Sequence, residues 1–195
     1  MSALSFRAAI GPDIAPWLDD VARLRLTVFR DWPYLYDGDL AYERRYLDRY
    51  AAGDTILVAA FDGARMVGAA TGMPLSDHAD DFAAAFKGRD IDFADMFYCA
   101  ESVLLPDWRG QGAGHAFFDR REAHARALGF SSSSFCAVQR PRDHPARPGG
   151  YSPLDGFWRK RGYAPLDGVV ARFSWRDLGE ADETEKPLEF WMRRL

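Results

Sequence analysis

Cysteine is scarce in this sequence of 195 residues, which contains only Cys99 and Cys136. Two cysteines are too few for the disulfide framework of a small secreted domain, so we expect a reducing compartment. Positive charge is not in excess either, because 25 Lys and Arg face 29 Asp and Glu, for a net charge of -4. Nucleic-acid-binding domains usually carry a strongly basic face, so no nucleic-acid partner is expected.

Long hydrophobic runs are also missing. No segment approaches the roughly 18 consecutive apolar residues of a membrane span, and the N-terminal MSALSFRAAIG lacks the basic start and long apolar core of a signal peptide. We therefore expect a cytoplasmic protein without a membrane partner. The length suits one domain over residues 1–195.

Histidine is rare as well, and its four positions show no metal-ligand spacing. Two lie nine residues apart on one expected helix, and the other two fall in expected loops. We therefore expect ordinary surface histidines and no metal site. The four are His78, His115, His124 and His144.

What the sequence does contain is a succession of strand-like and helix-like segments. An Asp-Gly turn between two β-rich runs predicts a hairpin over residues 55–73. A helix with Asp13 as its N-cap is expected to reach Val28. Together the pattern predicts a mixed α/β sheet with helices on both faces. The expected strands are residues 4–10, 55–61, 66–73, 96–105, 132–138, 169–175 and 188–195, the last two joined by an acidic connection; the helices are 13–28, 41–51, a short one within 74–95, 113–128 and 154–161.

Three glycines stand at the mouth of the helix expected over residues 113–128: Gly110, Gly112 and Gly114. Glycine allows backbone amides to approach a ligand closely, and a helix N-terminus favours anions. The segment is therefore a candidate phosphate cradle. The alternative is a tight strand-to-helix turn without a ligand, which would need fewer glycines.

Two familiar nucleotide-binding loops do not fit this segment. A nucleotide-hydrolase loop ends in Gly-Lys-Ser/Thr, where this chain has Ala-Gly-His at residues 113–115. In a dinucleotide-binding fingerprint His115 would occupy the place of the third glycine, and the next strand, SSSSFCAVQR, lacks the expected acid.

The segment Arg-Gly-Gln-Gly-Ala-Gly, residues 109–114, resembles the R/Q-x-x-G-x-G/A signature of the GNAT family of N-acetyltransferases. Leu-Leu-Pro precedes it at residues 104–106, as in that family. Phe-Trp-Arg-Lys-Arg-Gly-Tyr at residues 157–163 is similar to the family's second motif. The resemblance covers nearly the whole chain and implies a twisted, mostly antiparallel mixed sheet of about seven strands.

By this resemblance the co-substrate is acetyl-coenzyme A. The backbone of the loop would hold its pyrophosphate, and exposed backbone groups on the preceding strand would pair with the pantetheine arm. The implied cofactor-binding residues are Val103, Leu104, Leu105, Arg109, Gly110, Gln111, Gly112, Ala113 and Gly114. Arg140, Arg142 and Arg147 form a basic loop, which is expected either to contact the nucleotide's 3′-phosphate or to be an ordinary solvated loop.

Glu101 is the candidate base for the acceptor amine, since it lies within the apolar run MFYCAESVLL and acids on this strand often serve that role in the family. The alternative is that Glu101 pairs with an arginine or binds the substrate's ammonium group. Trp158 stands where the family usually has a tyrosine proton donor, and an indole cannot act as an acid. The donor is then expected to be Tyr151, Tyr98 or water, whereas Tyr163 is expected in the core.

By the same resemblance, the acceptor site is expected between the loop joining the first two helices, DWPYLYDGD, the strand of Glu101 and the acidic connection DLGEADETEK. Tyr34, Tyr36 and Tyr98 are its candidate substrate-binding residues. Aromatic and acidic side chains together favour a cationic small molecule. The alternative is that the loop aromatics are buried plugs of the core.

The resulting hypothesis is an enzyme that transfers acetyl from acetyl-coenzyme A directly to a primary amine of a small molecule in a ternary complex. Two alternatives stay open: a non-catalytic acyl-coenzyme A sensor, which Trp158 favours, and an acetyltransferase of protein lysines or N-termini. A homodimer is compatible with each of these hypotheses.

Overall fold

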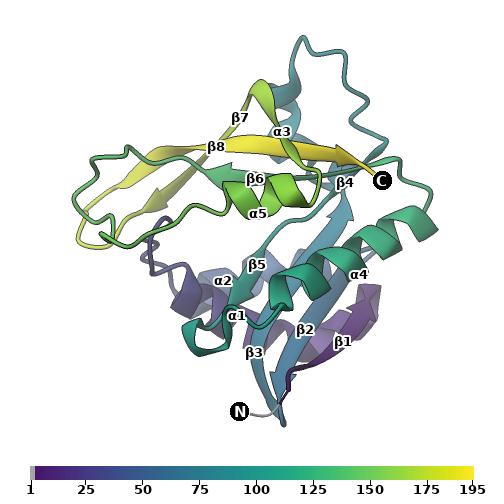
Figure 1. The fold of residues 1–195 in the computed structure, drawn as a ribbon, viewed down its shortest axis with the longest axis horizontal. Coiled ribbons are helices and arrows are strands. Elements are labelled where there is room, and N and C mark those ends of the chain that lie inside the picture. The colour runs from purple at the N-terminus through teal and green to yellow at the C-terminus, as the bar shows by residue number, and fades with distance from the viewer. Residues whose placement is uncertain (1–2) are drawn as a thin grey trace.

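The computed structural model describes residues 3–195, which form an eight-stranded sheet (Figure 1) in the order β1-β2-β3-β4-β6-β8-β7, with β5 paired to β3 beside this path. Only β4 and β6 pair in parallel. This confirms the predicted mixed, mostly antiparallel sheet. The strands are β1 (Ser5–Ile10), β2 (Ile56–Asp62), β3 (Arg65–Pro74), β4 (Met96–Tyr98), β5 (Ser102–Leu104), β6 (Ser132–Val138), β7 (Ala164–Arg176) and β8 (Glu183–Arg194).

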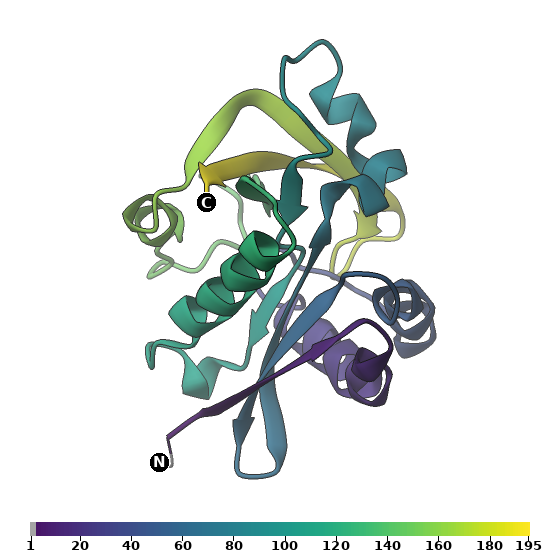
Figure 2. The ribbon, with the colours of Figure 1, turned by 90° about the vertical axis from the view of Figure 1, so that its right-hand side faces the viewer.

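Helices cover both faces of the sheet, as predicted. Figure 2 shows α4 on one side, and α1 with α2 on the other. The α-helices are α1 (Leu18–Val28), α2 (Leu40–Leu47), α3 (Ala79–Phe86), α4 (Ala113–Ala127) and α5 (Asp155–Lys160); the 3-10 turns are η1 (Gly11–Trp17), η2 (Asp48–Tyr50), η3 (Leu75–His78) and η4 (Pro106–Trp108).

The side chains on the two faces of β2 belong to two separate hydrophobic cores. Leu57 and Ala59 pack with the residues of α1 and α2, whereas Val58 and Ala60 pack with those of α4. Successive strand residues point to opposite faces, so a fully apolar strand is required when both faces are covered. A third core joins α3 to β7 and β8 and contains Phe82, Phe86, Val169 and Phe190.

Two local predictions were wrong. Asp13 is not an N-cap, because residues 11–17 form η1 and α1 begins at Leu18. In a helix capped by Asp13, Pro16 would stand at N3 and would offer no N–H to the Asp13 side chain. The acidic connection before residue 188 is shorter than predicted, because β8 already begins at Glu183. Glu185, in this part of β8, forms a 2.8 Å ion pair with Arg172 of β7.

Candidate active site

The strand expected over residues 96–105 is in fact two strands joined by a bulge. β4 and β5 pair with β3 in registers that differ by one residue. Thr71 of β3 faces two residues there: its carbonyl accepts from the Ala100 N–H at 3.0 Å, and its N–H donates to the Glu101 carbonyl at 3.1 Å. Bulges bend a strand and re-aim its side chains, and they occur often beside active sites.

The sheet opens just beyond this bulge. The parallel pairing of β4 with β6 ends where the Cys99 N–H donates to the Ser134 carbonyl at 2.7 Å. After that point β5 pairs with β3, and β6 pairs with β8. Among the described residues no backbone pairing joins β5 to β6. Backbone groups on the facing edge of β5 are therefore available to a ligand.

Alternation along β5 decides which backbone groups face the opening. The Leu105 N–H donates to the Val67 carbonyl of β3 at 3.0 Å, and Val103 pairs with β3 in the same register. In an antiparallel pair alternate residues bond to opposite sides, so Leu104 turns its groups toward the opening. Its carbonyl accepts from Arg109 Nε at 3.2 Å. Val103, Leu104 and Leu105 were predicted to pair with the pantetheine arm. Of these three, Leu104 is the residue whose backbone groups face the opening.

The glycines of the predicted cradle are required for two different structural reasons. Gly110 and Gly112 have φ values of 76° and 83°, in the left-handed region that favours glycine, and a Cβ at either position would meet open space. A Cβ on Gly114 would instead lie 3.2 Å from Cζ of Phe157. Gly114 therefore allows α5 to pack closely on α4.

The N-terminus of α4 has the features of an anion site. Gly112 is its N-cap, no side chain caps it, and its first turn contains no acidic residue. The first amides of a helix have no intrahelical acceptor, and the helix dipole favours negative charge there. Arg109 and Gln111 are exposed beside this turn, ahead of Ala113. The predicted cradle residues are thus contiguous and open.

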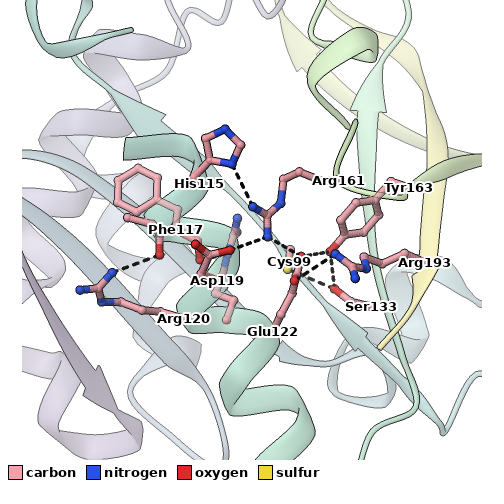
Figure 3. A network of polar contacts seen from close by, with 12 residues as sticks. Cys99, His115, Phe117, Asp119, Arg120, Glu122, Ser133, Arg161, Tyr163 and Arg193 are labelled. Carbon is pink, nitrogen blue, oxygen red and sulfur yellow. Dashed lines mark hydrogen bonds and ion pairs between the residues drawn. The ribbon is translucent and has the colours of Figure 1, made fainter. Parts of the chain in front are cut away.

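A polar network fixes α5 and the second motif against α4 (Figure 3). Arg161 donates to Asp119 at 2.8 Å and to Glu122 at 3.1 Å. The buried Tyr163 hydroxyl donates to Glu122 at 3.1 Å and lies 2.9 Å from the Ser133 hydroxyl, from which its oxygen can accept. Burial raises the pKa of Tyr163, which lies in the core as expected.

A cavity of about 450 Å³ lies between the α1–α2 connection, the bulge and the β7–β8 hairpin. Ala100 and Glu101 line it from one side of the opening in the sheet, and Cys136 lines it from the other. The cavity therefore reaches the point where the strands separate. The three predicted substrate-binding residues, Tyr34, Tyr36 and Tyr98, all line it.

The α1–α2 connection is bound to the end of the β7–β8 hairpin. Arg140 joins the two, since it donates to Asp177 at 2.6 and 2.8 Å and to the carbonyls of Pro33 and Tyr34 at 2.9 and 2.7 Å. Although burial alone would raise the pKa of Asp177, the bond from Arg140 lowers it. Both predictions for Arg140 were wrong, because it is neither solvated nor free to contact a phosphate.

The loop aromatics combine the two roles that the sequence left open. The Tyr34 ring packs 4.3 Å from that of Phe29 and also lines the cavity. Tyr36 is half-buried, and desolvation together with Glu43 raises the pKa of its hydroxyl. A Cβ on Gly38 would overlap the Tyr36 ring, so glycine is needed there for space.

Glu101 is buried at 6% exposure and both of its carboxylate oxygens already accept hydrogen bonds. Thr71 donates to Oε1 at 2.8 Å, and Arg25 and Tyr50 donate to Oε2 at 2.7 and 3.2 Å. Arg25 is also paired with the fully buried Glu43. These contacts favour the arginine-pairing alternative for Glu101, and its role as base stays a prediction.

Three residues of the cavity region were missed by sequence reasoning. Arg25 and Glu43 belong to helices whose polar residues are expected on the solvent face. His78, expected at the surface, is 4% exposed and lines the cavity. No local pattern indicates its burial, since its ring packs against Tyr50 and Tyr98 from distant parts of the chain as well as against Phe82.

Tyr151, a predicted proton donor, and Trp158, at the position of the family's usual donor, both lie outside the cavity wall. Tyr151 packs 5.9 Å from Trp32 and beneath Arg147, and it is not part of the cavity wall. Trp158 packs 4.9 Å from Phe135 in the core. The donor role of Tyr151 stays a prediction, which Tyr151→Phe tests.

Over the part of the chain that the structure describes, no helix is long and apolar enough to cross a membrane. Across residues 3–195, no cluster of three or more His, Cys, Asp or Glu side chains is placed to hold a metal ion.

Comparison with known proteins gives one family and one fold. The family model described as "Acetyltransferase (GNAT) family" matches residues 20–149. No curated protein sequence matches the chain. Similar solved structures include a ribosomal-protein-alanine N-acetyltransferase from Brucella melitensis, with TM-score 0.63 and 13% identity over 98% of this chain and 99% of that one. Another is a phosphinothricin acetyltransferase from Sinorhizobium meliloti in complex with acetyl-coenzyme A, with TM-score 0.61 and 15% identity over 100% and 89%. An N-acetyltransferase from Staphylococcus aureus has TM-score 0.58 and 11% identity over 99% of both chains.

Proposed function

Because the chain belongs to the GNAT family of acetyltransferases, we propose that it transfers an acetyl group from acetyl-coenzyme A to the primary amine of a small molecule. The transfer is direct, within a ternary complex. The observation that carries the proposal is a cavity of about 450 Å³ that meets the opening of the sheet and has an acidic, aromatic wall.

Acetyl-coenzyme A suits the opposite side of this opening. Its pyrophosphate fits the uncapped, acid-free N-terminus of α4, and its pantetheine amides would pair with the backbone of Leu104. The similar Sinorhizobium meliloti structure contains this co-substrate, which supports the assignment.

The charge of the cavity wall favours a cationic acceptor. Five carboxylates line it, against two guanidiniums, and both guanidiniums are already paired: Arg25 with Glu43 and Glu101, and Arg176 with Asp37. An acceptor that bears its own carboxylate would find no free cation in this wall as the structure describes it. The carboxylates are Asp37, Asp39, Asp81, Glu101 and Glu183.

Aromatic side chains favour the same kind of ligand. Ring faces attract cations, and rings bury the apolar part of an arylalkyl or alkyl amine. The volume lies within the range of small-molecule sites. The aromatic lining consists of Phe29, Tyr34, Tyr36, Tyr42, Tyr46, Phe82, Tyr98, Phe173 and Trp175.

Direct transfer is favoured over a covalent acetyl-enzyme because the cysteines are poor nucleophiles. Burial raises the pKa of Cys99, and it raises that of Cys136, which lines the cavity, to about 12. The thiolate is the reactive form of cysteine. The amine nitrogen therefore attacks the thioester carbonyl itself. The C–N bond forms first, and the C–S bond then breaks as the tetrahedral intermediate collapses and releases the coenzyme A thiol.

Thiol release from acetyl-coenzyme A in the presence of an amine panel tests the proposal. The panel pairs each amine with its amino acid, such as tyramine with tyrosine and histamine with histidine, and includes a lysine peptide. We expect release with the small amines and initial-velocity lines that intersect, as a ternary complex requires. Acetyl-coenzyme A binding without release on any acceptor would identify a sensor, and release on the peptide alone would identify a protein acetyltransferase.

A further inference from the structure

His78 is a buried histidine in the wall of the acceptor cavity. It ends η3, between β3 and α3, and its Nδ1 lies 3.0 Å from Oδ2 of Asp81. A carboxylate only accepts hydrogen bonds, so Nδ1 carries the hydrogen and Nε2 keeps a lone pair. Nε2 is buried and has no hydrogen-bond partner among the described residues.

An unpartnered buried polar atom destabilises the folded state, so its presence needs a reason. The other side chains around the His78 ring leave Nε2 without a donor. The ring centroids of Tyr98 and Phe82 lie 5.9 and 5.8 Å from that of His78. That of Tyr50 lies at 6.3 Å, and the Tyr50 hydroxyl is directed at Glu101 and Tyr46. No side chain among the described residues supplies the partner of Nε2, and the His78 residue lines the cavity.

The charged groups near the ring act through Nδ1. Arg49 of η2 places Nη1 3.3 Å from Oδ2 of Asp81 and 3.5 Å from Nδ1 of His78. Asp81 is thus held by both neighbours, and it fixes the tautomer of His78. This carboxylate–imidazole pair has the arrangement of a base with its orienting group.

Glu101 and His78 differ in how free they are to take a proton. Every bond that Glu101 accepts comes from a protein donor, including the Arg25 guanidinium at 2.7 Å. A substrate N–H would have to displace one of these donors. The Nε2 lone pair of His78, in the same cavity wall, has no such competitor.

We propose that His78, oriented by Asp81, is the base that deprotonates the acceptor amine; this inference rests on the proposed acetyl transfer. Nε2 takes a proton from the substrate ammonium, directly or through one water, and the free amine attacks the thioester carbonyl. The second amine proton leaves as the tetrahedral intermediate collapses and neutralises the coenzyme A thiolate. His78 then returns its proton to solvent. Glu101 positions Arg25 and adds negative charge that attracts the ammonium group.

The test uses the full chain and the acceptor with the highest kcat/KM in the amine panel. We expect His78→Gln to lower kcat by about 10²-fold or more and to flatten the acidic limb of kcat/KM, with the acetyl-coenzyme A thermal shift unchanged. Asp81→Asn should lower kcat by about tenfold while retaining a displaced limb. Added imidazole should restore part of the activity of His78→Ala, which a purely structural role would not allow.

Two controls make the outcome decisive. His124→Gln removes an imidazole on α4 that bonds to the Asp54 carbonyl outside the cavity, and its kinetics should match the wild type. Glu101→Gln should raise KM for the acceptor and keep the acidic limb. The proposal is overturned if His78→Gln stays within a few-fold of wild type, if imidazole restores nothing, or if Glu101→Gln alone removes the limb. A wild type that acetylates no amine would instead refute the proposed function.

Discussion

Single residues at the mouth of α4 decide whether it accepts an anion. Gly112 has a left-handed φ of 83° and faces open space. Asparagine and aspartate tolerate this conformation better than other residues with a Cβ. A comparison of these two substitutions at Gly112 therefore separates the effect of charge from that of backbone strain.

We expect acetyl-coenzyme A to raise the Tm of the wild type by mass-action linkage. Gly112→Asp should abolish that rise, because a carboxylate would stand where the pyrophosphate binds. Gly112→Asn, with nearly the same shape and no charge, should keep most of it. The measurement is a thermal scan at millimolar ligand. Equal losses in both variants would show that backbone strain, not charge, is responsible.

Tyr36 is a single residue of comparable interest in the wall of the cavity. It lines the cavity beside Gly38 and lies far along the chain from the α4 cradle. Tyr36→Ala should raise the apparent KM for the acceptor about tenfold and leave that for acetyl-coenzyme A within a factor of two, a loss of roughly 1.4 kcal/mol in acceptor binding. Equal changes in both KM values, together with a lower Tm, would mean that Tyr36 only supports the core.

At the scale of elements, the acceptor wall depends on the α1–α2 connection being held to the β7–β8 hairpin. The Asp37 N–H donates to the Arg176 carbonyl at 2.9 Å, and the Leu178 N–H donates to the Leu35 carbonyl at 2.7 Å. Arg140 and Asp177 add the charged pair to this contact.

Asp177→Asn should lower stability at pH 7 by about 2 kcal/mol, or roughly 5 °C in Tm for a chain of this length. The folded-state pKa of Asp177 is lowered. Its contribution is therefore complete above the ordinary carboxyl pKa, about 3.9, and is lost as the pH falls through the lowered value. The Tm difference between variant and wild type should accordingly shrink below about pH 4.

Glu185→Gln is the matched control on the same hairpin. Its carboxylate pairs with Arg172 on the exposed face, where ion pairs contribute about 0–1 kcal/mol. Its Tm should stay close to that of the wild type at every pH. A loss as large as that of Asp177→Asn would show that any hairpin charge matters equally, and the connection would then have no special role.

At the scale of the whole molecule, the two proposed substrate sites differ in charge. The cofactor side offers the N-terminus of α4 and Arg109, whereas the cavity wall has five carboxylates and two paired guanidiniums. Like charges in a binding site cost several kcal/mol, so the wall selects against acidic acceptors.

Tyramine should therefore exceed tyrosine in kcat/KM by about 10²-fold or more, corresponding to roughly 2.7 kcal/mol. KM for tyramine should rise with added salt, because ions screen the attraction between the ammonium group and the wall. Initial rates at 20 and 300 mM NaCl measure both effects. Comparable use of tyrosine and tyramine would contradict the cationic-acceptor assignment while leaving acetyl transfer intact.

Much of the fold follows from short-range patterns in the sequence. Asp62-Gly63 between two apolar runs predicted the β2–β3 hairpin, and the structure confirms it. The apolar spacing that ends at Gly129 predicted α4 closely, and Gly129 has the left-handed φ of a C′ glycine. These signals depend on neighbouring residues only, so tertiary packing had little to change. The glycine segment and the second motif likewise indicated the family that the comparison confirms.

The sequence by itself thus determined most of the helices and strands, the glycine-rich mouth of α4 and the family. Only the tertiary structure decided the bulge at Ala100 and Glu101, the opening beside it, and the burial of His78 against Asp81. The reason is physical: a turn or a helix depends on residues a few positions apart. Strand register, in contrast, is set by partners about 30 residues away, here Thr71 opposite residues 100–101. The acceptor cavity likewise gathers side chains from eight helices and strands, and no local pattern in the chain encodes that meeting.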